Sequence, residues 1–106
     1  MINKIVMDAL KNIGVPVSFQ TYSGKKDPYI TFFTYLDKGE QFADDGEVIT
    51  GYYVQIDIWT KKDYTQVSKE VHERMIDKGF IKKGFYDLYE DDLKIYHKVM
   101  RFFKEV

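Results

Sequence analysis

The sequence has 106 residues, of which 44% are hydrophobic and 17% aromatic, so it suits one folded domain with a single core rather than a disordered chain. Sixteen basic and seventeen acidic residues give a net charge of −1. This balance argues against a dedicated nucleic-acid-binding protein and leaves only a local basic patch open. The absence of cysteine excludes disulfides, thiolate nucleophiles and sulfur-ligated zinc, and it fits a reducing cytosol. Nine tyrosines and eight phenylalanines favour either an aromatic core or an aromatic interface.

The first element predicted along the chain is an amphipathic helix. Apolar residues recur at helical spacing at Ile2, Ile5, Val6, Ala9, Leu10 and Ile13. The pattern stops at Gly14, with Pro16 after it, which is the expected order of helix stop signals. The segment is not a continuous apolar block, so we expect neither a signal peptide nor a membrane span, but a soluble intracellular protein. A short edge strand should follow, with Val17 and Phe19 on one side.

Two longer strands are predicted in the middle of the chain. Residues 29 to 36 are almost all β-branched or aromatic and are apolar at both parities, as in a strand covered on both faces. The strand over about residues 48 to 60 also needs cover on both sides. One of its faces holds Val54, Ile56 and Ile58, and the other holds Tyr53 and Trp59. Residues 37 to 47 between the strands hold two glycines and five acids against one lysine, which predicts a mobile loop of charge −4.

The last part of the chain predicts a second helix and a hairpin. Asp63 is suited to cap a helix that ends at Gly79. The hairpin strands are expected at about residues 85 to 89 and 93 to 103. The order is therefore α-β-β-β-α-β-β. We expect residues 1–106 to form a single α+β domain, with a mostly antiparallel sheet and two helices packed on one face.

Two helices on one face leave the opposite face of the sheet without internal cover, so a partner is expected there. Burying one Tyr or Trp removes about 150–250 Å² from water, and a handful of such side chains reaches the scale of a specific interface. Aromatic residues that point outward from the two middle strands are therefore candidate contacts between copies of the chain. They are Tyr29, Phe33, Tyr35, Tyr53 and Trp59.

Residues that could support catalysis or bind a metal are sparse. His72 and His97 have no paired histidine nearby in sequence, and the acids at 90 to 92 lack the alternation of a calcium loop, so we expect no metal. Neither a nucleophile elbow nor a Gly-rich phosphate loop occurs. The acids of residues 37 to 47 are better explained by solvation or a partner contact than by acid/base work. We therefore expect a protein that is not an enzyme and has no cofactor.

Positive charge is scattered along the second half of the chain. The lysine pairs at 61–62 and 82–83 are the nearest approach to a nucleic-acid signature, together with basic residues near the C-terminus. Neighbouring acids cancel much of this field, so an ordinary solvated surface is favoured. We expect no sequence-specific nucleic acid and no membrane among the partners.

The order of elements and four segments point to one family. The segments are VPVSF at 15–19, DPYITFFTY at 27–35, IDIWTKK at 56–62 and LKIYHKVMRFF at 93–103. Across nearly the whole chain they resemble the small tail-completion or tail-terminator proteins of long-tailed phages and prophages. The nearest matches to the family are Pro28-Tyr29-Ile30 and Ile56-Asp57-Ile58-Trp59.

The resemblance implies a structural protein that forms a ring, hexameric in the family, which caps the tail tube and joins it to the head. The implied partners are copies of the chain, the tail-tube protein and the head-completion protein. The implied locations are the host cytoplasm during assembly and the virion tail. In such a ring the acidic loop would line the lumen and repel passing DNA, or would contact the tube. Its candidate residues are Asp37, Glu40, Asp44, Asp45 and Glu47.

A second hypothesis belongs to another class of protein. The chain could be a small intracellular ligand-binding or regulatory α+β domain, in which the aromatic sheet face forms the wall of a pocket for an apolar or planar ligand. A concave aromatic cleft in a monomer would favour this hypothesis, whereas a flat aromatic face between copies would favour the ring.

Overall fold

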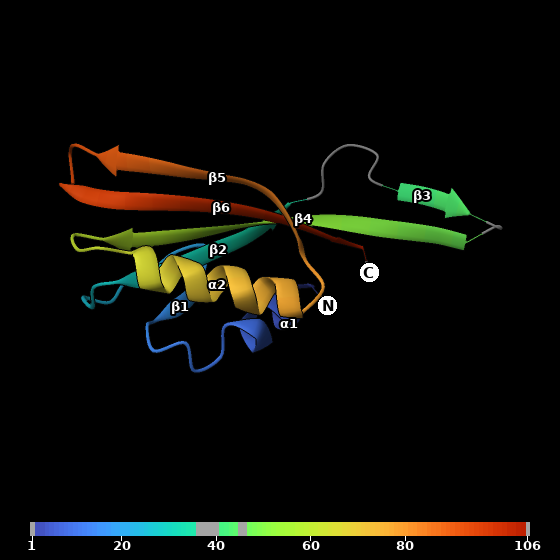
Figure 1. Ribbon diagram of the computed structural model, residues 1–106, viewed down its shortest axis with the longest axis horizontal. Helices are drawn as coiled ribbons and strands as arrows, with labels where there is room; N and C mark the ends of the chain where they lie inside the picture. Colours follow the sequence, from blue (N-terminus) through green and yellow to red (C-terminus); the bar gives the residue numbers. More distant parts are fainter. Residues whose placement is uncertain (1, 36–40, 45–46, 106) are drawn as a thin grey trace.

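A computed structural model describes the backbone of residues 2–35, 41–44 and 47–105, and the side chains of residues 2–35 and 51–105 (Figure 1). The elements are α1 Ile2–Ala9, β1 Val17–Phe19, β2 Tyr29–Tyr35, β3 Gln41–Asp44, β4 Glu47–Thr60, α2 Thr65–Asp77, β5 Ile81–Glu90 and β6 Ile95–Glu105. No helix among these residues is long and apolar enough to cross a membrane.

The sheet runs in the order β1-β2-β4-β6-β5. Only the β1–β2 pair is parallel, and the pairs β2–β4, β4–β6 and β5–β6 are antiparallel. β1 lies at the edge, as predicted. The predicted fold class, an α+β domain with a mostly antiparallel sheet and two helices, is confirmed.

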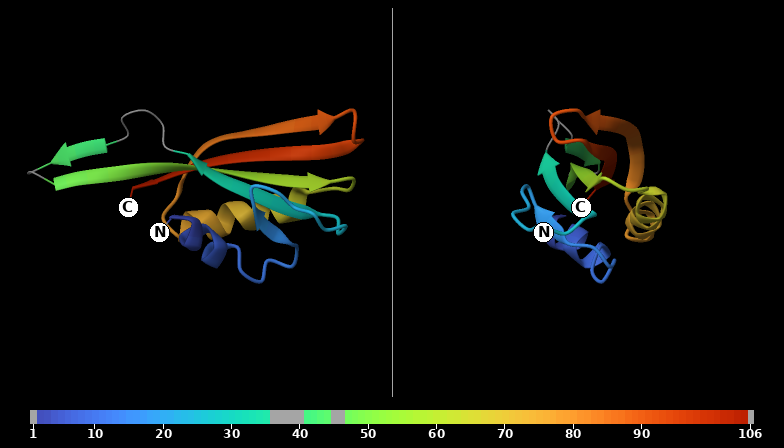
Figure 2. Two further views of the ribbon diagram at one scale, coloured as in Figure 1. Left: turned by 180° about the vertical axis from the view of Figure 1, so that it is seen from behind. Right: turned by 90° about the vertical axis from the view of Figure 1, so that its left-hand side faces the viewer.

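Both helices lie on the same face of this sheet, which we call the helix-covered face (Figures 1 and 2). Aliphatic and aromatic side chains from the helices and three strands meet there and form the core. Its buried members are Val6, Ala9, Leu10, Ile30, Phe32, Val54, Ile56, Ile58, Val71, Met75, Phe80, Met100 and Phe102. Because residues alternate across a strand, the neighbours of these side chains along β2, β4 and β6 point to the opposite face.

The first helix is shorter than its apolar pattern predicts. It ends at Ala9, although the Leu10 amide still donates to the Val6 carbonyl at 3.1 Å. Asn12 has a φ of 60° and Gly14 a φ of 96°, so the chain enters left-handed conformations that cannot continue a helix. Ile13 packs against the core from this turn.

The second helix ends as predicted but begins differently. Tyr64 occupies the N-cap position, and the Asp63 carboxylate accepts hydrogen bonds from the Thr65 amide at 2.9 Å and from the Thr65 hydroxyl at 2.6 Å. Asp63 therefore still satisfies a free amide of the first turn. At the other end Gly79 has a φ of 91°, and the Phe80 amide donates to the Met75 carbonyl at 3.0 Å.

The prediction of a loop over residues 37 to 47 is partly wrong. Residues 41 to 44 form β3, which pairs with the first four residues of β4 so that Asp44 lies opposite Glu47. Phe42 and Ala43 face Ile49 and Val48 in this register, and such residues pair readily as strands. The intervening sequence Asp-Gly is typical of two-residue hairpin turns. Asp37, Glu40 and Asp45 lie outside the described residues, as do the side chains of Asp44 and Glu47.

Asp27 fixes the pairing of β2 with β4 at one end of the sheet. Its carboxylate accepts hydrogen bonds from the Thr60 hydroxyl and, at 2.9 Å, from the Lys61 amide. Burial raises the pKa of Asp27, but these hydrogen bonds outweigh that effect and hold the pKa below 3.8. The ionised carboxylate thereby supports the register in which Tyr29 faces Trp59.

Candidate assembly surface

The face of the sheet opposite the helices, the helix-free face, is assembled from outward-pointing residues of four strands. In the register of the sheet, Tyr29, Trp59, His97 and Leu88 form one row across β2, β4, β6 and β5. Tyr35, Tyr53, Phe103 and Ile81 form a parallel row near the other end. The five aromatic residues predicted as contacts between copies, Tyr29, Phe33, Tyr35, Tyr53 and Trp59, therefore all lie on this face.

The predicted aromatic residues are divided between two ring clusters. In the first, Trp59 stacks on the imidazole of His97 with 3.7 Å between ring centroids, and Tyr29 lies 6.2 Å from Trp59. In the second, Tyr53 stacks on Tyr35 at 5.4 Å and touches Phe103 at 4.9 Å. The predicted residues are half-buried by one another, and no helix among the described residues covers them.

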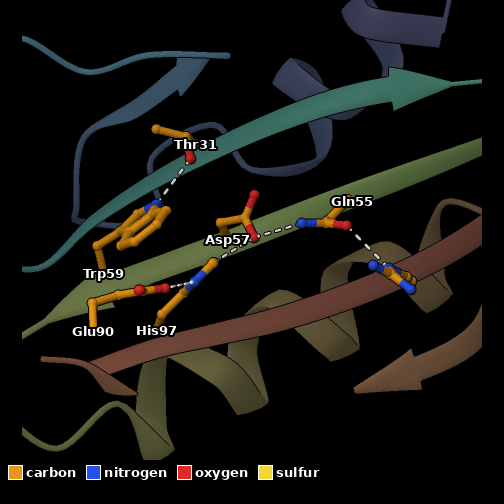
Figure 3. Close-up of polar contacts among 7 residues, drawn as sticks. Thr31, Gln55, Asp57, Trp59, Glu90 and His97 are labelled. Carbon is orange, nitrogen blue, oxygen red and sulfur yellow. Dashed lines mark hydrogen bonds and ion pairs between the residues drawn. The ribbon is translucent and has the colours of Figure 1, made fainter. Parts of the chain in front are cut away.

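Gln55 and Asp57 of β4 lie between the two clusters in the register of the sheet. Figure 3 shows the polar contacts that link them to His97 and Glu90. The Trp59 indole donates to the Thr31 hydroxyl at 3.0 Å. Asp57 Oδ1 accepts from the Gln55 amide at 2.8 Å and lies 2.6 Å from His97 Nε2. On the other side of the ring, His97 Nδ1 lies 3.1 Å from Glu90 Oε1.

Both nitrogens of His97 face carboxylate oxygens, so both act as donors only when the imidazole is protonated. Asp57 is 4% exposed and His97 is 8% exposed, so the two side chains form a buried ion pair when His97 is protonated. Burial lowers the pKa of His97, but the hydrogen bonds to Asp57 and Glu90 outweigh it and raise the pKa above 6.5. Within the described part of the chain, no group of three or more His, Asp or Glu side chains is arranged to hold a metal ion.

The aromatic residues of this face were predicted from the sequence, whereas its polar residues were not. Gln55 and Asp57 stand between the aliphatic residues of β4, at the same parity as Tyr53 and Trp59. These two polar residues at alternate positions were the signal in the sequence that this face of β4 is not uniformly aromatic. The partner of Asp57 comes from β6, 40 residues away, so the network itself depends on a register that local patterns do not specify.

A separate groove of about 900 Å³ lies on the helix-covered face, beside the N-terminal end of α2 and over β5 and β6. Tyr64 donates to Asp87 at 2.7 Å, and Lys98 pairs with the same carboxylate at 3.0 Å. Burial, together with the hydrogen bond to Asp87, raises the pKa of Tyr64 to about 12. The groove is lined by Lys61, Lys62, Asp63, Tyr64, Thr65, Ser68, Lys69, His72, Lys82, Phe85, Asp87, Tyr96 and Lys98.

Comparisons with known proteins identify a similar fold. No protein-family model and no curated protein matches the sequence. Among solved structures, the chain is similar to one chain of a structure described as "Virion of native gene transfer agent (GTA) particle", with a TM-score of 0.53. The similarity covers 95% of this chain and 83% of the other at 11% sequence identity. The two chains thus share a fold, and one known setting of that fold is a virion particle.

Proposed function

We propose that this protein is a structural subunit of a phage-like particle, and specifically a tail-completion or tail-terminator protein. Copies of the chain would form a ring that ends the tail tube and joins it to the head. The shared fold with a chain of a gene transfer agent virion supports the structural role, and the sequence resemblance described above supports the position in the tail. In this role the chain is not an enzyme, its partners are its own copies, the tube protein and the head-completion protein, and it is carried in the virion tail after assembly in the host cytoplasm.

The observation that carries the proposal is the helix-free face with its two aromatic clusters. A standard interface buries about 800 Å² per partner, and burying one large aromatic side chain contributes about 150–250 Å². Tyr29, Phe33, Tyr35, Tyr53 and Trp59 are each already half-buried within the chain. On the same face of β5, Tyr86 is 49% exposed and Leu88 is 47% exposed, so the surface that a second copy could cover extends from β2 to β5.

The acidic segment of residues 37 to 47 has a proposed role in the same ring. Its carboxylates at Asp37, Glu40, Asp44, Asp45 and Glu47 would face the lumen or the tube. Near a lumen they would repel phosphates and keep passing DNA from adhering to the wall. A six-fold ring, as in the resembling family, would concentrate this negative charge around one opening.

A ligand-binding role is less well supported by the geometry. The ligand-binding hypothesis predicts a pocket against the aromatic face of the sheet. The groove of about 900 Å³ instead lies on the helix-covered face, where only Tyr64, Phe85 and Tyr96 contribute large aromatic rings and lysines dominate the lining. The ring is therefore the function that we propose.

The direct test is assembly of the purified protein, alone and with the tube protein of the same particle. We expect closed rings by negative-stain electron microscopy and a matching mass by light scattering. In particles made without the protein, we expect tails that are not joined to heads. Persistent monomer under both conditions, together with normal particles in its absence, would contradict the proposal.

A further inference from the structure

The hairpin formed by β3 and the first residues of β4 has no partner within the described chain. Residues from Gly51 onward in β4 pair with β6, whereas Glu47 to Thr50 pair only with β3. Figures 1 and 2 show the hairpin extending beyond the rest of the sheet. An isolated two-stranded hairpin is marginally stable in water, so a contact with another surface would stabilise it.

Charge indicates what kind of surface that is. Residues 37 to 47 carry five acids and one lysine, a net charge of −4. The register sets Asp44 directly opposite Glu47, and like charges in a directly opposed pair are unfavourable. A basic surface would relieve this repulsion. In sequence, Phe42 stands between Glu40 and Asp44, so the segment combines negative charge with one large apolar residue.

The groove beside α2 has the complementary chemistry. Its lining includes five lysines and two aspartates. Lys98 pairs with Asp87, whereas Lys61, Lys62, Lys69 and Lys82 form no salt bridge with any described residue. Phe85 lies in the lining, with the Lys82 ammonium 4.2 Å from its ring centroid. The groove thus offers cations around an aromatic surface, which suits an acidic segment with an apolar side chain.

The hairpin and the groove lie at opposite ends of a molecule that is 50 Å long. The hairpin projects at one end, and the β4–α2 connection with the start of α2 lies at the other (Figure 1). A subunit's own hairpin therefore cannot reach its own groove. A contact in which one copy supplies the hairpin and the next supplies the groove is head-to-tail, and head-to-tail contacts generate rings when the rotation closes.

We propose that the basic groove binds the acidic β3–β4 hairpin of a second copy of this chain. The proposal names a contact for the ring under Proposed function and rests on that function for its biological setting. In this contact Asp44, Asp45 and Glu47 face the groove of the neighbour, so the role at the lumen or the tube is narrowed to Asp37 and Glu40. A nucleic acid is the less suitable occupant, because the chain has a net charge of −1 and lacks the overall positive field of a nucleic-acid-binding protein. Every copy of this chain carries the acidic hairpin, so a neighbouring copy supplies the negative charge that the groove would bind.

Charge reversal tests the contact. The groove-reversed variant carries Lys61→Glu, Lys62→Glu and Lys82→Glu, all at exposed positions. The hairpin-reversed variant carries Asp44→Lys, Asp45→Lys and Glu47→Lys. We expect each variant alone to lose self-association in sedimentation velocity at low ionic strength, because like charges then meet. An equimolar mixture should associate again, since each groove then meets a hairpin of opposite charge.

A matched control reverses three exposed lysines outside the groove, Lys11→Glu, Lys25→Glu and Lys26→Glu, and should associate like the wild type. If either reversed variant associates normally alone, or if the mixture stays dissociated while the wild type associates, the proposed contact is wrong even though the ring itself could stand. Thermal unfolding of each variant verifies that the subunit is folded.

A binding assay separates this contact from ring formation. The probe is a fluorescent peptide of residues 39 to 48, titrated with the full-length protein, and a scrambled peptide of the same composition is the control. We expect the native peptide to bind, and the groove-reversed variant to bind it at least about tenfold more weakly. Tighter binding of a DNA duplex than of the peptide, or equal binding of both peptides, would overturn the proposal. If the protein binds the peptide but particles made without the protein are normal, the proposed function is contradicted and the proposed contact is not.

Discussion

The two faces of the sheet are built from alternate residues of the same strands, yet different chemistry fills them. On the helix-covered face β4 contributes Val54, Ile56 and Ile58, all fully buried beneath the helices. On the helix-free face the intervening residues Gln55 and Asp57 belong to a hydrogen-bonded network between two aromatic clusters. One face is therefore held by apolar burial, which is non-directional, and the other by directed contacts with defined donors and acceptors.

This difference has a consequence for how each face tolerates change. An apolar core loses stability in proportion to the volume removed, and neighbours partly refill the space. A buried ion pair loses stability for another reason, because removal of one partner leaves the charge of the other buried and unpaired. Substitutions on the two faces should thus cause losses of stability of similar size. They should differ in whether a second substitution restores the stability and in how the loss depends on pH.

The largest effect is expected on the helix-covered face. Phe32 of β2 is fully buried in the core, and Phe32→Ala should destabilise the protein by about 3–5 kcal/mol in urea unfolding. Its neighbour Phe19 contacts the Phe32 ring at 5.5 Å but is 43% exposed, so Phe19→Ala should cost much less. Equal losses for the two variants would contradict the assignment of the core to this face.

The next largest effect is expected at the centre of the helix-free face. His97→Leu removes the imidazolium and leaves the Asp57 carboxylate buried, at a cost of about 3 kcal/mol in the free energy of unfolding. The double variant His97→Leu with Asp57→Asn should recover part of this loss, because no charge is then buried. A double variant that is additive in the two single losses would show that the two side chains do not interact.

The sequence specifies the helix-covered face better than the helix-free one, and the reason is physical. The period of apolar residues in Ile2–Ala9 and the alternation of Val54, Ile56 and Ile58 with polar residues in β4 report which side is buried, and this information is local. The contact of His97 with Asp57 and Glu90 exists only because β6 pairs with β4 and with β5. Such contacts join residues that no local pattern relates.

The β3 strand was missed for a different reason. Acidic residues and glycines in residues 37 to 47 outweighed the weaker signal of Phe42-Ala43 and Val48-Ile49 flanking an Asp-Gly dipeptide. Strand pairing depends on the facing residues as much as on propensity, so a short hairpin is easily hidden by polar neighbours. The candidate groove was missed because its lysines are scattered along the chain and meet only where α2 lies beside β5 and β6.

The two faces should also differ in their response to pH. The pKa of His97 is raised above 6.5 in the folded state, so its contribution to stability is complete below that pH. The contribution is lost as the pH rises through the raised pKa, because the neutral imidazole cannot donate to both Asp57 and Glu90. Urea unfolding across this range should show a decline in stability for the wild type and a smaller decline for His97→Leu. An identical decline in both would assign the pH dependence to other groups.

The smallest effect on the subunit, and the one that bears most on function, is expected at Trp59. Trp59→Ala removes a hydrogen bond to Thr31 and the stacking on His97, which together should cost about 1–2 kcal/mol of stability. If the helix-free face is an interface, self-association should weaken by a larger free energy, because a half-buried Trp becomes fully buried only when a partner covers it.

The control for Trp59→Ala is Tyr89→Ala, which removes an exposed aromatic from the other side of the sheet. Tyr89→Ala should leave both unfolding and association nearly unchanged, since the ring contacts mainly Tyr96 at 5.1 Å. A loss of stability at Trp59 comparable to that at Phe32, with association unaffected, would make Trp59 a core residue. The helix-free face would then be a second, self-sufficient core, and the contact between copies would have to be sought at the groove and the hairpin.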